Sequence, residues 1–155
     1  MGTNDGAHGA SAPAPPEGGA AHRPHVVLDT NVFVAAGFNP HSNAARILER
    51  IRAGTWTMVW NRATRRETEA VLAQIPPLSV QDAAPAFRPE AEVVAETHPD
   101  RFAFVPDPGD RKFAALAAAT GAVLVTNDDH LLSQRHRLAV EVLTPSEAMA
   151  RYGQS

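Results

Sequence analysis

The chain has 155 residues, of which 44% are hydrophobic and 20% charged, and its formal net charge is -3 at pH 7. This length allows one domain with a sizeable core and is too short for two. Cysteine is absent, which excludes disulfides and thiolate metal sites. A slightly acidic chain does not bind nucleic acid through its whole surface. Any nucleic-acid-binding site must therefore be local, with a metal ion that offsets the charge of the carboxylates.

The first 24 residues differ in composition from the rest of the chain. Residues 1–24 consist mainly of Gly, Ala, Pro, Ser and His, without apolar periodicity. Such a segment buries too little surface to offset its ordering entropy, so we predict a disordered leader and one folded domain over residues 25–152. No apolar run reaches the roughly 18 to 20 residues of a membrane span. The N-terminus also lacks a secretory segment, so we expect a cytoplasmic protein without membrane contact.

The rest of the sequence predicts strands that alternate with helices. Short apolar runs predict strands, and apolar residues at helical spacing predict helices. In chain order these are a strand at 25–29, a helix at 42–52, a strand at 56–60, a helix from its cap at 61 to about 75, a helix at 90–97, a strand at 102–105, a helix at 111–120, strands at 122–126 and 138–143, and a helix from 145. The pattern predicts an α/β fold with a parallel sheet of about five strands, covered by helices on both faces.

Four acidic residues lie where ligands of such sheets bind, beyond the carboxyl ends of the strands. Asp29 ends the first strand, Asp128 follows the fourth, Asp110 opens the helix after the third, and Glu67 lies in the helix after the second. Each alone has an ordinary structural explanation, as a cap, a turn residue or a charge on a solvated face. Carboxylates that meet at one place repel one another unless a cation lies between them. Mg²⁺ or Mn²⁺ prefers such ligands, and a water polarised by the metal attacks phosphodiesters.

Several segments together resemble the PIN-domain family, in the branch of toxin components of toxin–antitoxin systems. They are residues 26–34 (VVLDTNVFV), 67–72 (ETEAVL), 107–117 (DPGDRKFAALA), 125–132 (VTNDDHLL) and 144–147 (TPSE). The resemblance covers roughly residues 25 to 150, with the segments in the family's order. It implies a metal-dependent ribonuclease with a PIN-like three-layer sandwich of about five parallel strands between helices.

The resemblance also implies roles for individual residues. The family's metal-binding and catalytic acids match Asp29, Glu67, Asp110 and Asp128. Two further positions, Asn31 and Thr126, match polar residues beside the metal, where they would orient water or a carboxylate.

Three residues near these acids have less definite roles. Asp107 matches a recurrent acid of the branch, with turn formation and ligation as equal alternatives. Asp129 ranks below Asp128, because family members vary at this position. His130 stands where relatives often carry an acid, and we expect an exposed histidine after a turn rather than a ligand.

Substrate contacts are harder to assign. Arg62, Arg65 and Arg66 precede Glu67 on one predicted helix and could meet RNA phosphates. The equal alternative is an ordinary solvated face that includes Glu69. We expect the two tryptophans of the second strand to lie in the core.

Two other functions compete with the ribonuclease. A haloacid-dehalogenase-like phosphatase would use Asp29 as nucleophile, but its Asp-x-Asp pattern is broken by Asn31 and Glu67 would have no role. A non-catalytic binding module would serve only a partner such as an antitoxin peptide. An antitoxin protein and a homodimer are expected from the family branch, and the sequence does not indicate which RNA is cut.

Overall fold

The computed structural model describes residues 23–154, so most of the predicted leader at 1–24 lies outside the described residues. Four parallel strands form one sheet in the order β2-β1-β3-β4. Their bounds are His25–Leu28 for β1, Thr57–Met58 for β2, Val123–Val125 for β3 and Val142–Leu143 for β4. Leu28 lies opposite Val125 across β1 and β3. The residues that follow these two central strands therefore emerge side by side.

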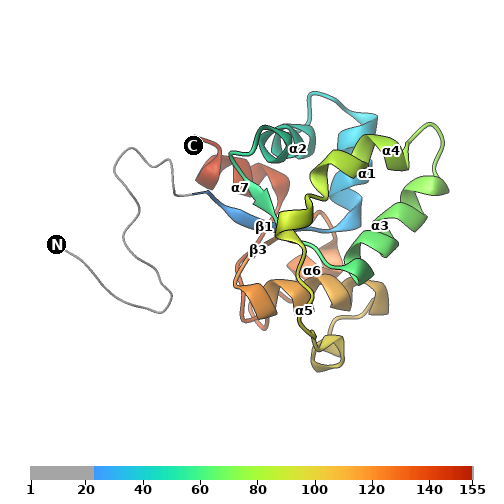
Figure 1. Ribbon diagram of the computed structural model, residues 1–155. Coiled ribbons are helices and arrows are strands. Elements are labelled where there is room, and N and C mark those ends of the chain that lie inside the picture. The colour runs from blue at the N-terminus through green and yellow to red at the C-terminus, as the bar shows by residue number, and fades with distance from the viewer. Residues whose placement is uncertain (1–22, 155) are drawn as a thin grey trace.

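Helices cover both faces of this sheet (Figure 1). Val26 and Leu28 face a core that includes residues of α1, α2 and α7, whereas Val27 faces a second core formed with α5 and α6. This alternation is the two-residue period of a strand, and it confirms the predicted α/β sandwich. The helices are α1 Thr30–Phe38, α2 Asn43–Ala53, α3 Arg62–Ala73, α4 Val80–Ala83, α5 Arg111–Thr120, α6 Asp129–Leu132 and α7 Pro145–Tyr152. No helix within residues 23–154 is long and apolar enough to cross a membrane.

The helix boundaries follow from capping chemistry. Asn61 and Thr64 form a reciprocal capping box at the start of α3, and Thr144 and Glu147 form another at α7. Gly121 ends α5 with a φ of 76°, a conformation that favours glycine. The predicted helices at 42–52, 61–75 and 111–120 and from 145 are confirmed. The sequence does not predict the bounds of α1, because the apolar run of this helix lacks an amphipathic period.

The strand predicted at 102–105 is wrong, and within residues 23–154 the sheet has four strands rather than about five. A 3₁₀ turn covers Pro99–Phe102, and the segment then packs against α5 without joining the sheet. The guanidinium of Arg111 donates hydrogen bonds to the carbonyl oxygens of Ala103 at 3.0 Å and Val105 at 2.9 Å. These carbonyls are thus taken by a side chain instead of by a neighbouring strand.

The helix predicted at 90–97 is also wrong. A single 3₁₀ turn, Pro89–Ala91, is followed by extended chain beside the end of β2. The backbone N–H of Val93 donates to the carbonyl of Trp60 at 2.7 Å, which holds this segment along the sheet edge. The strand predicted at 138–143 is shortened to β4. Both tryptophans are buried, as predicted.

Candidate metal centre

The carboxyl ends of β1 and β3 bring Asp29, Thr126 and Asp128 into one chain of hydrogen bonds. The hydroxyl of Thr126 donates to Oδ2 of Asp29 at 2.6 Å, and it accepts from the N–H of Asp128 at 2.9 Å. Oδ1 of Asp29 accepts from the N–H of Thr30 at 2.7 Å, so Asp29 also caps α1. Thr126 is fully buried, and its hydroxyl links the two acids.

The third acid, Asp110, lies at the end of a 3₁₀ turn, Pro108–Asp110, directly before α5. Asp107 forms this turn by accepting from the N–H of Gly109 at 2.9 Å. Asp110 is buried, yet its Oδ2 has no hydrogen-bond partner among the described residues. A buried, unpartnered carboxylate oxygen is costly in a folded protein unless a proton or a cation satisfies it.

Glu67 approaches from α3 and is held by a residue that the sequence analysis missed. The ammonium of Lys112, on the first turn of α5, lies 2.9 Å from Oε1 of Glu67. A signal was available, because Lys112 is the chain's single lysine and stands two residues after Asp110. Its partner is 45 residues away in the sequence, however, and the pairing depends on how α3 packs against α5.

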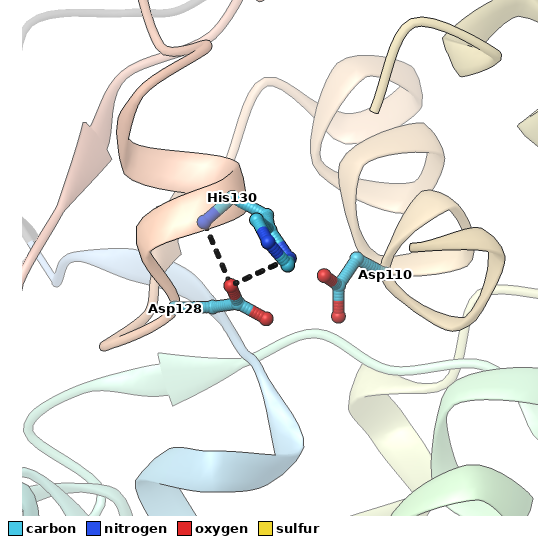
Figure 2. A group of neighbouring side chains, drawn as sticks. All are labelled: Asp110, Asp128 and His130. Atoms are coloured by element: carbon cyan, nitrogen blue, oxygen red, sulfur yellow. Dashed lines mark hydrogen bonds and ion pairs between the residues drawn. The ribbon is translucent and has the colours of Figure 1, made fainter. Parts of the chain in front are cut away.

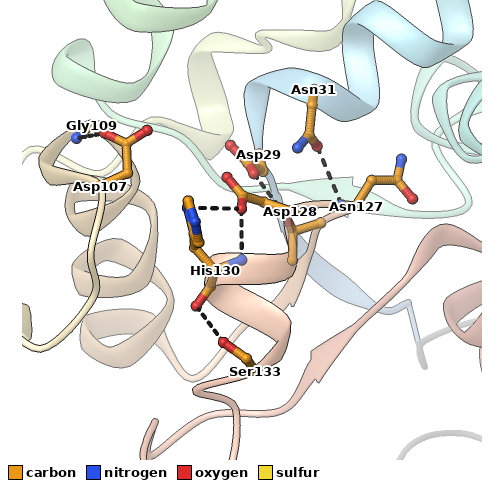
Figure 3. Close-up of polar contacts among 9 residues, drawn as sticks. Asp29, Asn31, Asp107, Gly109, Asn127, Asp128, His130 and Ser133 are labelled. Carbon is orange, nitrogen blue, oxygen red and sulfur yellow. Dashed lines mark hydrogen bonds and ion pairs between the residues drawn. The ribbon is translucent and has the colours of Figure 1, made fainter.

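These elements enclose a cleft of about 230 Å³. Six of the predicted site residues line it, namely Asp29, Asn31, Glu67, Asp107, Asp110 and Asp128. Figure 3 shows Asp29, Asn31 and Asp128 gathered at the ends of the central strands. Oδ1 of Asn31 accepts from the N–H of Asn127 at 3.3 Å, which ties α1 to the loop after β3. Asp129 is exposed and is not among the residues that line the cleft.

Burial raises the pKa of Asp29 and of Asp110, and neighbouring carboxyl groups add to the shift. Burial, with smaller contributions from Asp128 and Asp107, raises the pKa of Asp29 from 3.8 to about 6, although its hydrogen bonds from Thr126 and Thr30 oppose the shift. Burial, the facing Asp128 carboxyl and the charge of Asp29 raise the pKa of Asp110 to about 8. The free carboxylates are therefore destabilised at neutral pH, and a positive ion between them would relieve this.

His130 lies at the rim of the same group (Figure 2). Its ring Nδ1 is 3.7 Å from Oδ1 of Asp128, and the side chain is 61% exposed. The expected exposure is confirmed. One ligand atom each of Asp110, Asp128 and His130 nevertheless lies within 4.8 Å of the others, a spacing that suits a shared metal ion.

The three arginines of α3 lie outside the cleft. Arg65 pairs with Glu69 at 2.8 Å, and its guanidinium lies over the rings of Trp60 and Phe87. Arg62 and Arg66 are exposed, and with Arg65 they line a shallow hollow of about 350 Å³ next to Trp60. The ion pair of Arg65 with Glu69 favours the alternative in which Arg65 belongs to an ordinary helix face with Glu69 rather than to an RNA contact.

Comparison with known proteins identifies the family of this chain. The family model for the PIN domain matches residues 25–130, a span that contains all four acids. The chain belongs to the PIN-domain family, whose members are generally metal-dependent nucleases. The fold is similar to the crystal structure of PAE2754 from Pyrobaculum aerophilum, with a TM-score of 0.52 and 19% identity over 90% of this chain and 95% of that one. No curated protein matches.

The donor set fits the divalent metal that PIN domains typically use. Carboxyl groups from four separate segments of the chain line one cleft, among them Asp110 with its unpartnered Oδ2. Hard cations such as Mg²⁺ and Mn²⁺ bind ligands of this kind. Asp29, Glu67, Asp110 and Asp128 line this cleft and would hold the ion.

Proposed function

We propose that this chain is a metal-dependent endoribonuclease in which Asp29, Glu67, Asp110 and Asp128 bind Mg²⁺ or Mn²⁺. The observation that carries the proposal is the buried Oδ2 of Asp110, which has no partner among the described residues and belongs to a cleft lined by the other three acids. A divalent ion bound there supplies a polarised water and a Lewis acid for phosphodiester hydrolysis.

The chain's own residues orient this chemistry. Thr126 fixes the carboxylate of Asp29 through the 2.6 Å hydrogen bond, and Lys112 directs Glu67 through the ion pair. Asn31 stands at the cleft wall, where its amide can orient water or an RNA phosphate. Asp107 shapes the turn that presents Asp110, which favours the turn-forming alternative for this residue.

The biological role that we propose is the toxin of a toxin–antitoxin pair, with an antitoxin protein and a second copy of this chain as partners. Support comes from the resemblance of residues 107–117 and 125–132 to the toxin branch of the family. A neighbouring reading frame for a small DNA-binding protein would agree with this role. Growth arrest on induction, relieved by co-expression of that protein, would test it directly.

The decisive experiment is cleavage of a mixed RNA pool with Mn²⁺ or Mg²⁺ by the wild type and Asp110→Asn. Asp110 suits this test better than Asp29, because its side chain makes no cap hydrogen bond whereas Asp29 caps α1. The control is Asp82→Asn, an exposed acid on α4. We expect metal-dependent cutting by the wild type and the control, and loss of cutting in Asp110→Asn.

Two outcomes would contradict the proposal. If the folded wild type binds metal but cuts no RNA, the binding-module alternative replaces the nuclease. If Asp110→Asn cuts as fast as the wild type, the activity comes from elsewhere or from a contaminant. Single-stranded DNA in a parallel reaction checks that RNA is the substrate.

A further inference from the structure

His130 is joined to the acidic cleft through its own backbone. It is the second residue of α6, and its N–H donates to Oδ1 of Asp128 at 2.8 Å. The same Asp128 oxygen lies 3.7 Å from the ring Nδ1. The hydrogen bond therefore holds the backbone of His130 next to Asp128, and the imidazole beside it is 61% exposed.

The spacing of the three side chains matches the size of a metal coordination sphere. Metal–ligand bonds of about 2.0–2.2 Å place two ligands of one ion roughly 3 to 4.4 Å apart. The candidate ligand atoms of Asp110, Asp128 and His130 all lie within 4.8 Å of one another, which is close to the upper end of this range.

The buried Asp110 is an independent sign of a ligand at this place. Its Oδ2 makes no hydrogen bond within the described part of the chain, and Asp110 is 7% exposed. Figure 2 shows its carboxyl directed toward Asp128 and His130. An ion between the three side chains would satisfy this oxygen.

An imidazole changes which ion is preferred. Mg²⁺ takes oxygen ligands almost exclusively and keeps several waters, whereas transition-metal ions also accept imidazole nitrogen. We propose that His130 joins Asp110 and Asp128 as a nitrogen ligand, so that the site prefers a divalent transition-metal ion such as Mn²⁺ over Mg²⁺. This inference rests on the proposed metal site, and it adds a residue that the resemblance does not assign to it.

The test measures metal binding without RNA, on untagged protein, so that activity is not the readout. Calorimetric titrations with Mn²⁺ and with Mg²⁺ compare the wild type, His130→Asn, and the control His41→Asn, an exposed histidine between α1 and α2. We expect His130→Asn to weaken Mn²⁺ binding about tenfold or more while Mg²⁺ binding changes little. His41→Asn should bind both ions as the wild type does.

Pulsed electron paramagnetic resonance of bound Mn²⁺ provides a direct second readout. Nuclear modulation from ¹⁴N should be present in the wild type and in His41→Asn, and absent in His130→Asn. Bound Mn²⁺ without ¹⁴N modulation in the wild type would overturn the nitrogen ligand and leave the acidic site intact. Equal losses of Mn²⁺ and Mg²⁺ affinity in His130→Asn would overturn the selectivity. Failure of the wild type to bind either ion would overturn the proposed function itself.

Discussion

The ammonium of Lys112 lies 2.9 Å from Oε1 of Glu67, and this ion pair links α5 to α3. Lys112 therefore brings a positive charge to a cleft lined by Asp29, Asp110 and Asp128. The two side chains are 25% and 36% exposed, so solvent screens their attraction only in part. In the absence of metal, this lysine should counteract the mutual repulsion of the acids.

Replacing Lys112 should therefore destabilise the metal-free protein more than the metal-bound protein. We expect Lys112→Met to lower the free energy of unfolding in EDTA by on the order of 1 kcal/mol. Saturating Mn²⁺ should shrink this loss, because the ion then neutralises the same carboxylates. Lys112→Arg, which keeps the charge, should behave like the wild type. Urea unfolding in both conditions measures the effect, and an equal loss with and without Mn²⁺ would contradict it.

Glu67 and Glu69 form a matched pair for testing the site. Both lie on α3, both form an ion pair at 2.8 to 2.9 Å, and they are 36% and 35% exposed. Only Glu67 lines the cleft. We expect Glu67→Gln to weaken Mn²⁺ binding by about tenfold or more, and to reduce RNA cleavage at least as much, because the site loses a charge.

Glu69→Gln should leave both quantities near their wild-type values. Calorimetry and initial cleavage rates at saturating Mn²⁺ separate affinity from turnover. Equal effects of the two substitutions would mean that the charge of α3, rather than the position of Glu67, controls the reaction.

The sequence predicted the proximity of those site residues that follow neighbouring strands of the sheet. Asp29 and Asp128 follow neighbouring parallel strands, so their proximity follows from topology alone. The Glu67–Lys112 pair depends instead on the packing of α3 against α5, which periodicity does not specify. The apolar segment at 102–105 looked like a strand because a pattern of hydrophobic residues does not reveal that the Arg111 side chain takes its carbonyls.

The raised pKa values of Asp29 and Asp110 predict how stability depends on pH. Both carboxyls hold protons more tightly in the folded protein than in the unfolded chain, whose pKa is near 3.8. The metal-free protein should therefore lose stability as pH rises from about 4 through 6 and toward 8. The lost stability should return when Mn²⁺ is added at pH 8.

Asp110→Asn tests this origin, because the amide carries no charge at any of these pH values. We expect the variant to be more stable than the wild type in EDTA at pH 8, by on the order of 2 kcal/mol. The difference should shrink toward pH 5, where the wild-type carboxyl is protonated in the folded state. If the free energy of unfolding changes with pH in the same way for both proteins, Asp110 is not the source of the pH dependence.

The arginines of α3 should separate into one structural and two RNA-contacting residues. Arg65 is held by Glu69 and by the rings of Trp60 and Phe87, so Arg65→Gln should mainly destabilise the fold, by about 1 kcal/mol. Arg62→Gln and Arg66→Gln should weaken RNA binding and lower the slope of log affinity against log salt by about 1 each. Fluorescence anisotropy at several salt concentrations measures this slope, with Mn²⁺ affinity as the control. An unchanged slope in both variants would assign these arginines to the solvated face.

Thr126 offers the sharpest test of how the acids are positioned. Its buried hydroxyl donates to Oδ2 of Asp29 and accepts from the N–H of Asp128, so Thr126→Val leaves a buried carboxylate oxygen and a partly buried N–H without this partner. We expect this variant to lose about 1–3 kcal/mol of stability and about tenfold or more in Mn²⁺ affinity. Thr126→Ser keeps the hydroxyl and should recover the metal affinity, while the missing methyl still lowers stability by about 1 kcal/mol. If Thr126→Val binds Mn²⁺ as the wild type does, Asp29 needs no such support, and the hydroxyl serves folding alone.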